Sequence, residues 1–428
     1  MSRVVVGMIG LGTVGTGVVR LLEQQRHLSL KKVAVKDLAK ERELLPSCPI
    51  TATVNEVIDD PEIEILIEVM GGEQPALDYI KRAIEKRKHI VTANKEVLAK
   101  HGPELFQLAK QRGVAIFFEA SVAGGVPLIS TISKGLEANQ ISCVTGILNG
   151  TTNFILSKME EDNESYAGAL SKAQALGFAE SDPTNDVDGF DVAYKLSILS
   201  ALSYQRFTRP DQIFREGIRN ISAEDMAQAH ELGYRIKLVG SAKRSANGAV
   251  AVRVHPTMVP LGHPLAAVSG SNNGILVSGH AVGDIVMVGP GAGQMPTASA
   301  IVGDTINLAS ALQLPDFASY FQPKIEPEWA ETDSPGEWVC PYYLRISVSD
   351  TPGVIGRVGT IFGDHDVSIL SIFQKGVEGK GARIVILTHA VKNSKMDAAL
   401  AELQKCEFLQ KLESSIRIFN PVQNNGSN

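Results

Sequence analysis

The stretch VVVGMIGLGTVGTGVV, residues 4–19, decides the fold of the first part of the chain. It opens with a short apolar run and continues, at Gly10-x-Gly12-x-x-Gly15, into a helical pattern. In this spacing the first glycine permits a tight turn and the second lets the backbone approach a pyrophosphate. The third lets the helix pack close to the strand. The stretch therefore predicts a strand, a phosphate-binding turn and a helix.

Short apolar runs alternate with helical patterns from there to residue 118. Continuous apolar strands that alternate with helices indicate a parallel sheet covered on both faces. We therefore expect an α/β fold in which residues 1–134 form a Rossmann-type domain that binds NAD(P), with Thr13 and Val14 at the phosphates. The expected strands cover 4–10, 31–37, 64–70, 89–93 and 114–120, and the expected helices cover 15–25, 74–87 and 103–111.

The end of the second expected strand bears on the choice of cofactor. Lys36 and Asp37 both stand where the chain would meet the adenosine ribose. An acidic residue there favours the 2′-hydroxyl of NAD, whereas a basic residue accommodates the 2′-phosphate of NADP. Because Lys40 and Arg42 follow closely, the sequence favours NADP with Lys36 as its contact, and NAD stays as the alternative.

The composition excludes several classes of protein. The 428 residues are too many for one core and suggest two or three domains. A formal net charge of −6 argues against a nucleic-acid partner, which would normally meet a basic face. Four widely spaced cysteines predict neither a disulfide framework nor a zinc site, and no apolar run is long enough to span a membrane. We expect a soluble, cytoplasmic protein.

The remaining sequence divides into three parts and a tail. Residues 135–321 mix strand and helix signals and predict an α+β domain, whose last helix, near 297–312, returns to the first domain. Residues 322–341 are rich in proline and acidic residues and predict a linker. Residues 342–420 predict a small βαββαβ unit, and residues 421–428 predict a disordered tail.

The stretch SDPTNDVDGFDVAYK, residues 181–195, places four aspartates within ten residues. An EF-hand loop does not fit it, because Lys195 falls where calcium needs a carboxylate. A solvated acidic loop is the simple alternative. The helix expected over 191–204 is apolar nearly all round, however, so Asp191 and Lys195, one turn apart, would be buried together. Such pairs cluster at functional sites, and we expect a pocket for a cationic amine with a lysine that exchanges a proton.

The longer run AQALGFAESDPTNDVDGFDVAYK, residues 173–195, closely resembles the signature of the homoserine dehydrogenase family. The blocks GLGTVG, TANKE, EASVAGGVP and NGTTN also resemble that family's blocks and stand in the same order. The resemblance covers residues 4–321, and no kinase segment precedes it, as in the monofunctional form. It implies an NAD(P)-dependent interconversion of aspartate 4-semialdehyde and homoserine in threonine, methionine and isoleucine biosynthesis.

The resemblance also implies roles for single residues. Glu180 would bind the substrate amine, and Asp186 would shape that end of the pocket. Asp191 would hydrogen-bond on the side of the reacting oxygen, and Lys195 would donate the proton to it. Lys95 would lie near both nicotinamide and substrate and share the acid–base work, so which lysine delivers the proton stays open. Further contacts would come from Asn149 and Gly150 to the substrate and from Asn94 to the cofactor.

Two glycine-containing loops have simple alternatives. In LNGTTNF, residues 148–154, helix capping alone would explain the pattern at Asn149. In GPGAGQMPTASA, residues 289–300, backbone amides at Gly293 would approach the cofactor from the far side of the cleft.

The loop EASVAGGVP, residues 119–127, carries no side-chain signature of a metal. The family resemblance implies that the backbone oxygens of Glu119, Val122, Gly124 and Val126 ligate a monovalent cation, sodium. A simple loop is the alternative.

The stretch LRISVSDTPGVIGRVGTIFGDHDVSILSI, residues 344–372, resembles the ACT domain, a regulatory unit that binds amino acids. Asp350, Gly353 and Val354 stand at its first strand–helix turn, where free helix amides can meet a carboxylate. The resemblance implies threonine as the effector and a homodimer or homotetramer. A plain turn that serves only subunit packing is the alternative.

Two other functions stay open at this point. One is another NAD(P)-dependent amino-acid semialdehyde oxidoreductase with the same first domain, against which Glu180 and the Asp191–Lys195 pair argue. The other is a non-catalytic regulator that senses nucleotides through the first domain and amino acids through the ACT unit.

Overall fold

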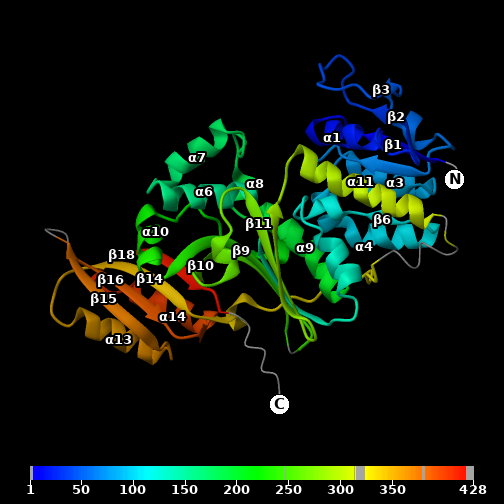
Figure 1. Ribbon diagram of the computed structural model, residues 1–428. Coiled ribbons are helices and arrows are strands. Elements are labelled where there is room, and N and C mark those ends of the chain that lie inside the picture. The colour runs from blue at the N-terminus through cyan, green and yellow to red at the C-terminus, as the bar shows by residue number, and fades with distance from the viewer. Residues whose placement is uncertain (1–2, 246, 313, 315–322, 378–380, 421–428) are drawn as a thin grey trace.

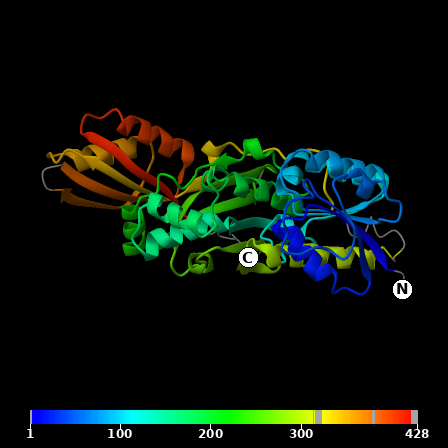
Figure 2. The same cartoon turned by 90° about the horizontal axis from the view of Figure 1, so that it is seen from above.

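The computed structural model describes residues 3–245, 247–312, 314, 323–377 and 381–420. Figures 1 and 2 show an elongated molecule with the N-terminal domain at one end, a mixed α/β domain in the middle and the ACT unit at the other end. The predicted α/β class is confirmed, and the predicted βαββαβ unit is present in the C-terminal part of the chain. The tail predicted to be disordered lies outside the described residues.

The N-terminal domain is built on a six-stranded parallel sheet in the order β3-β2-β1-β4-β5-β6. The order reverses beside β1, so the switch point where α/β sheets bind ligands lies at the carboxyl end of that strand. The first strand of the expected set is therefore central, and the two-residue strand β3 was not expected. The strands are β1 (Val4–Ile9), β2 (Leu28–Ala34), β3 (Ile50–Thr51), β4 (Ile65–Glu68), β5 (His89–Thr92) and β6 (Ile116–Phe117).

Helices cover both faces of this sheet. In β4, Ile65 and Ile67 pack into one core with helices α1 and α11, and Leu66 packs into the other core with α3 and α4. Helix α11 follows the last strand of the middle domain in the sequence and lies against Gly17 of α1. A Cβ added to Gly17 would lie 2.9 Å from that of Ala298. The helices are α1 (Thr13–Leu22), α2 (Asn55–Ile58), α3 (Ala76–Glu85), α4 (Lys95–Arg112) and α11 (Gln294–Ala311).

The helix expected to begin at Pro103 begins eight residues earlier, at Lys95. Asn94 caps it, because the side chain of Asn94 accepts a hydrogen bond from the amide of Val97 at 3.2 Å. Pro103 lies inside the helix and does not start it. The earlier start places Lys95 directly after β5, at the carboxyl edge of the sheet.

A second sheet of ten strands runs through the middle domain and into the ACT unit, in the order β12-β11-β7-β9-β10-β18-β14-β16-β15, with β8 beside β10. The long hairpin of β9 and β10 forms its centre. The strands that belong to the middle domain are β7 (Ile141–Ile147), β8 (Phe214–Arg215), β9 (Tyr234–Arg244), β10 (Val250–Pro260), β11 (Asn272–Gly279) and β12 (Gly283–Pro290).

Helix α9 fills the space between this sheet and α4. As its apolar sequence predicts, most of its side chains are buried, and Gly240 of β9 leaves room for Val192 and Leu196, which an added Cβ would meet at 2.7 and 3.0 Å. The helices of this domain are α5 (Leu128–Ser130), α6 (Gly150–Glu161), α7 (Tyr166–Ala175), α8 (Thr184–Val187), α9 (Phe190–Tyr204) and α10 (Ala223–Glu231).

The ACT unit has the expected βαββαβ order, but its sheet is continuous with that of the middle domain. Strand β18 pairs in parallel with β10, with Thr257 opposite Arg417 and Met258 opposite Ile418. Its elements are β14 (Tyr342–Val348), α13 (Val354–Asp364), β15 (Ile369–Val377), β16 (Gly381–Thr388), α14 (Asn393–Leu403) and β18 (Leu409–Ile418), beside a short pair of β13 (Val339–Cys340) and β17 (Val391–Lys392).

The described part of the linker expected over 322–341, residues 323–341, lies against the middle domain. The amides of Glu326 and Ala330 donate to the carbonyls of Gln205 and Phe207 at 2.7 and 2.8 Å. This segment therefore follows the surface of the middle domain on its way to the ACT unit. Within the described ranges, no helix is long and apolar enough to cross a membrane.

Candidate active site

Asp191 and Lys195 form a buried ion pair on one face of α9. The ammonium of Lys195 lies 2.7 Å from Oδ2 of Asp191 and donates a second hydrogen bond, at 2.6 Å, to the carbonyl of Leu148. The two side chains are 9% and 7% exposed. The predicted burial of this pair is therefore observed, and two acceptors fix the position of the lysine.

Lys95 brings a second ammonium to the same carboxylate. Its Nζ lies 2.6 Å from Oδ1 of Asp191, so each oxygen of this carboxylate binds one lysine. Lys95 comes from the first turn of α4 in the N-terminal domain, and its side chain is 40% exposed. The site thus joins the nucleotide-binding sheet to the buried helix of the middle domain.

Asn149 links this cluster to a second carboxylate. Its Nδ2 donates to Asp186 at 2.6 Å and to Asp191 at 2.9 Å. Its Oδ1 accepts from the amide of Thr152 at 2.8 Å and so caps α6. Asn149 therefore both caps α6 and links the two carboxylates. The neighbouring Gly150 allows the close approach of Ser271, whose carbonyl would lie 2.5 Å from a Cβ added to Gly150.

Burial and charge act in opposite directions on the pKa values of these groups. Burial lowers the pKa of Lys195, and the charge of Asp191 opposes this shift only in part. Burial alone would raise the pKa of Asp191, but the charges of Lys195 and Lys95 outweigh it and hold that pKa well below its ordinary range. The pKa of Lys95 is raised, mainly by the charge of Asp191. Burial and the nearby charge of Asp191 raise the pKa of Asp186.

Asn273 is a residue of this site that the sequence did not reveal. It is fully buried in β11, and its Nδ2 donates at 3.1 Å to the same Leu148 carbonyl that binds Lys195. Its Oδ1 has no hydrogen-bond partner among the described residues. An amide so far along the chain from Lys195 has no local pattern that would signal its role.

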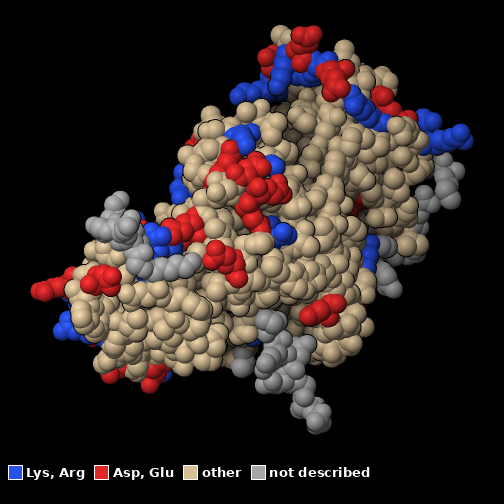
Figure 3. Space-filling model, turned by 60° about the vertical axis from the view of Figure 1, so that its left-hand side comes forward, with Lys and Arg blue, Asp and Glu red and all other residues tan. Residues whose placement is uncertain are grey.

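The four aspartates of residues 181–195 do not act as one group. Asp186 and Asp191 meet at Asn149, whereas Asp188 pairs with Arg219 at 2.6 Å and Asp182 accepts a hydrogen bond from the amide of Thr184 at 3.1 Å. Among the described residues no cluster of His, Cys, Asp and Glu has the arrangement of a metal site. In Figure 3, acidic side chains gather on the middle domain.

Glu180, which was expected at the substrate amine, is exposed and makes no ion pair within the described part of the chain. Only its backbone carbonyl is held, by a hydrogen bond at 3.0 Å from Gln174. The structure therefore brings together Lys95, Asp191 and Lys195 but leaves Glu180 outside their contacts.

The turn after β1 has the shape that a dinucleotide needs. A Cβ on Gly10 would lie 2.7 Å from the carbonyl of Val69, and one on Gly15 would lie 2.5 Å from the carbonyl of Gly10. A Cβ on Gly12 would meet nothing within 4 Å, so this glycine faces open space. Gly12 is the N-cap of α1, and no side chain caps the helix there. Its first amides, those of Thr13 and Val14, are thus placed for a phosphate.

Three other predicted cofactor contacts lie around this turn. Lys36 stands exposed just after β2, and within the described residues it forms no ion pair. Basic and acidic side chains lie together at this end of the molecule in Figure 3. Asn94 holds the neighbouring loop through a hydrogen bond at 2.8 Å to the carbonyl of Gly72. Gly293, with φ of +126°, is the N-cap of α11, the helix that packs on α1.

The predicted cation loop is closely packed. Glu119 caps α5 through both carboxylate oxygens, which accept from the amides of Ile129 and Ser130 at 2.8 Å. The carbonyls of Val122 and Gly124, in buried residues, accept no hydrogen bond from any described residue, whereas the carbonyl of Val126 accepts one from Leu128.

The predicted effector residues lie in the ACT unit, away from the N-terminal domain (Figure 1). Gly353, with φ of +91°, is the N-cap of α13, which begins at Val354, and Asp350 accepts a hydrogen bond at 3.3 Å from Gln374 of β15.

Known family models match the chain in the order of its domains. The model for the homoserine dehydrogenase NAD-binding domain matches residues 10–119. The homoserine dehydrogenase model itself matches residues 127–306, and the ACT domain model matches residues 342–408.

Relatives and solved structures agree with these matches. The homoserine dehydrogenase of Synechocystis sp. is 40% identical over 429 residues, which cover 97% of this chain and 99% of the relative. A crystal structure of a homoserine dehydrogenase from Thiobacillus denitrificans has a TM-score of 0.92 at 38% identity and covers 98% of this chain and 99% of its own. A hyperthermophilic archaeal homoserine dehydrogenase in complex with NADPH has a TM-score of 0.61 at 26% identity and covers 73% and 99%. This chain belongs to the homoserine dehydrogenase family, whose members are NAD(P)-dependent oxidoreductases.

Proposed function

We propose that the chain catalyses the reversible, NAD(P)H-dependent reduction of aspartate 4-semialdehyde to homoserine. The observation that carries this proposal is the single carboxylate of Asp191 held between the ammonium groups of Lys95 and Lys195. This group stands beside the carboxyl edge of the nucleotide-binding sheet, because Lys95 directly follows β5. Family membership supplies the reaction, and the cluster supplies residues able to perform it.

The bound dinucleotide would supply the hydride for the aldehyde carbon. Hydride addition builds negative charge on the carbonyl oxygen, and Lys195 neutralises that charge by donating a proton. Lys95, which remains charged because its pKa is raised, stabilises the same oxygen by its positive charge. Asp191 keeps both ammonium groups in place, and in homoserine oxidation Lys195 takes the proton back.

The other end of the substrate would be held by its amine. Asp186 is joined to the cluster through Asn149, and Gly150 beside Asn149 lets the Ser271 backbone pack closely against this end of the site. Glu180 is the second carboxylate we assign to the amine, and since it is exposed it would have to turn toward the bound substrate.

For the cofactor we propose NADP in preference to NAD. The amides of Thr13 and Val14 would hold the pyrophosphate, with Asn94 and Gly293 on the two sides of the cleft. Lys36 would bind the 2′-phosphate, since it is exposed and forms no ion pair within the described residues. The archaeal family member solved with NADPH supports this choice.

The Lys36→Ala variant tests the choice of cofactor. We expect the Michaelis constant for NADPH to rise at least about tenfold, as for the loss of one charge-assisted contact, while that for NADH stays within about twofold. Lys110→Ala, at an exposed lysine in the last turn of α4, is the matched control. Equal effects of Lys36→Ala on both cofactors would contradict the assignment.

We further propose a sodium ion at the loop of Glu119, Val122, Gly124 and Val126. Two buried residues of this loop, Val122 and Gly124, offer carbonyls without a hydrogen-bond partner among the described residues, and such groups are stabilised by a cation. Activity that requires added sodium after exhaustive dialysis would support the site, and activity independent of any monovalent cation would contradict it.

For regulation we propose that threonine binds at the turn of Asp350, Gly353 and Val354 in the ACT unit. We also propose that the chain forms a homodimer or homotetramer, because the outer strand β15 leaves Leu370 and Phe373 exposed at an open sheet edge. We place the protein in the cytoplasm, because all four cysteines are free thiols. Asp350→Ala should abolish inhibition by threonine without changing basal turnover, and light scattering should measure the oligomer. Unchanged inhibition would exclude this turn as the threonine site.

One assay separates this function from its two alternatives. The full-length protein is mixed with NADPH and aspartate 4-semialdehyde, and the loss of NADPH absorbance is measured with other aldehydes as controls. We expect rapid loss only with aspartate 4-semialdehyde. Equal rates with other semialdehydes would favour a different oxidoreductase, and cofactor binding without turnover would favour a non-catalytic regulator.

A further inference from the structure

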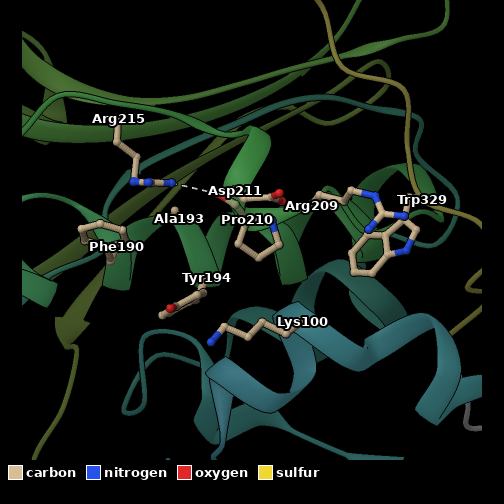
Figure 4. A pocket seen from close by; sticks show the side chains of 9 residues that line it. All are labelled: Lys100, Phe190, Ala193, Tyr194, Arg209, Pro210, Asp211, Arg215 and Trp329. Carbon is tan, nitrogen blue, oxygen red and sulfur yellow. Dashed lines mark hydrogen bonds between the residues drawn. The ribbon is translucent and has the colours of Figure 1, made fainter. Parts of the chain in front are cut away.

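A cavity separate from the candidate active site lies on another face of α9. Its volume is about 280 Å³, and it lies between α9, α4 and the segment that leads to the ACT unit (Figure 4). Phe190, Ala193 and Tyr194 line it from α9. At about 100° per residue, their face of the helix is turned by roughly a third of a turn from that of Asp191 and Lys195.

Two arginines in this cavity have no carboxylate partner among the described residues. The guanidinium of Arg209 lies 4.7 Å from the ring centre of Trp329, and that of Arg215 lies 4.2 Å from the ring centre of Phe190. Arg215 donates only to backbone carbonyls, and Arg209 donates no hydrogen bond within the described part of the chain. Stacking fixes a guanidinium and leaves its N–H edge available for a bidentate carboxylate, and in Arg215, whose Nη1 binds the two carbonyls, that edge is formed by Nε and Nη2.

Two other charged side chains, Lys100 and Asp211, line the cavity. Lys100 is already neutralised, because its ammonium binds Glu73 and Glu96, each at 2.7 Å. Asp211 lines the cavity and forms no ion pair with any described residue. The cavity therefore offers two guanidinium groups and one carboxylate that form no ion pair with any described residue, and Figure 4 shows Arg209 beside Trp329 on one side and Arg215 near Phe190 on the other.

We propose that this cavity binds an acidic α-amino acid. Such a ligand carries two carboxylates and one ammonium, the complement of the two guanidinium groups of Arg209 and Arg215 and the carboxylate of Asp211. A cavity of about 280 Å³ suits a ligand smaller than a drug-sized molecule, for which pockets usually begin at about 300 Å³. The assignment does not depend on the reaction proposed above.

The fluorescence of Trp329, in the cavity wall, can report the binding of a ligand. The chain has two tryptophans, Trp329 in the cavity wall and Trp338 outside it. In the full-length Trp338→Phe variant, all tryptophan fluorescence comes from Trp329. We expect L-glutamate to produce a saturable change in this fluorescence, with half-saturation in the millimolar range. The loss of one bidentate contact in a Trp338→Phe, Arg209→Gln double variant should weaken binding at least about tenfold.

The matched control is Arg244→Gln in the same background. Its guanidinium also stacks on an aromatic ring, 5.4 Å from the centre of Tyr204, but it does not line the cavity. We expect this variant to bind L-glutamate as the parent does. Equal weakening by Arg209→Gln and Arg244→Gln would overturn the assignment, because the effect would then not come from the cavity.

Three further ligands test the class of the occupant. Succinate lacks the amine, L-alanine lacks the second carboxylate, and inorganic phosphate is a plain anion. We expect each to bind at least about tenfold more weakly than L-glutamate, as for the loss of one charged contact. The absence of a saturable change with L-glutamate, or equal binding of phosphate, would overturn the proposal. Turnover of aspartate 4-semialdehyde is measured separately, so failure here leaves the proposed reaction untouched.

Discussion

Two clusters of buried charge in this protein are built on different cations. The lysine cluster, Lys95, Asp191 and Lys195, lies in the candidate active site and joins the N-terminal domain to the middle domain. The arginine cluster, Arg345 and Arg383 with Glu224 and Asp225, joins the middle domain to the ACT unit. Both clusters place basic groups on a buried carboxylate, but their chemistry differs.

The arginine cluster is centred on Arg345 of β14, which is 4% exposed. Its guanidinium donates to Asp225 at 2.9 Å, to Glu224 at 2.8 Å and to the hydroxyl of Ser222 at 3.0 Å. These acceptors lie at the N-terminus of α10, and Arg383 of β16 also pairs with Glu224. Every side of the guanidinium is thus satisfied.

The two clusters differ in whether their cation can lose a proton. A guanidinium stays charged at every physiological pH, so Arg345 can hold two domains together but cannot exchange a proton. An ammonium whose pKa is lowered by burial, as for Lys195, can donate and recover one. We infer that the arginine cluster is structural and that the lysine cluster is reactive.

The largest effect that separates the clusters should come from Asp191→Asn. This change removes the negative charge that keeps Lys195 protonated, so its pKa should fall further and the proton donor should be lost at neutral pH. We expect kcat for reduction to fall at least about 10²-fold, with partial recovery as the pH is lowered. A loss of rate that no pH recovers would show that Asp191 acts in another way.

The second effect should appear in stability and not in turnover. Arg345→Met leaves Asp225 buried without its partner, and breaking a buried pair in this way costs about 3–5 kcal/mol. We expect a lower free energy of unfolding in urea, with kcat within about twofold. Arg383→Gln is the matched control, since its side chain is 35% exposed and its pair should contribute about 0–1 kcal/mol. A large loss of kcat in Arg345→Met at full folding would contradict a purely structural role.

The smallest effect is the pH dependence of the wild-type enzyme. Our assignment of Lys195 as the proton donor requires its protonated form for reduction, so the kcat for reduction should fall as the pH rises through the lowered pKa of this lysine. Homoserine oxidation needs the neutral form, so its kcat should rise through the same range. Both midpoints should lie below the ordinary lysine value of 10.5. Rates that change in the same direction for both reactions would contradict this role.

Much of the fold follows from local sequence patterns. The apolar runs and the spacing of Gly10, Gly12 and Gly15 predict the parallel sheet and its phosphate-binding turn. The apolar composition of residues 191–204 predicts a buried helix. The join between β10 and β18 is different, because two strands far apart in the chain meet along only a few residues. No local pattern specifies such a pairing.

The candidate site also combines contacts that a local pattern predicts with contacts that only the folded chain creates. Asp191 and Lys195 lie one turn apart on one helix, so helix geometry alone predicts their contact. Lys95 and Asn273 reach the cluster from other elements, and only the folded chain brings them there. The arginine cluster is equally non-local, since Arg345 and Asp225 stand 120 residues apart in the chain. The family resemblance pointed to Lys95, but nothing in the sequence pointed to Asn273.

The central claim is that Lys195 donates the proton to the carbonyl oxygen, and the turnover of Lys195→Ala tests it most directly. At saturating NADPH and aspartate 4-semialdehyde, we predict that kcat falls at least about 10²-fold, the lower end for general acid catalysis, while the affinity for NADPH is unchanged. A variant that keeps a near wild-type kcat and only binds its substrate more weakly would contradict the claim.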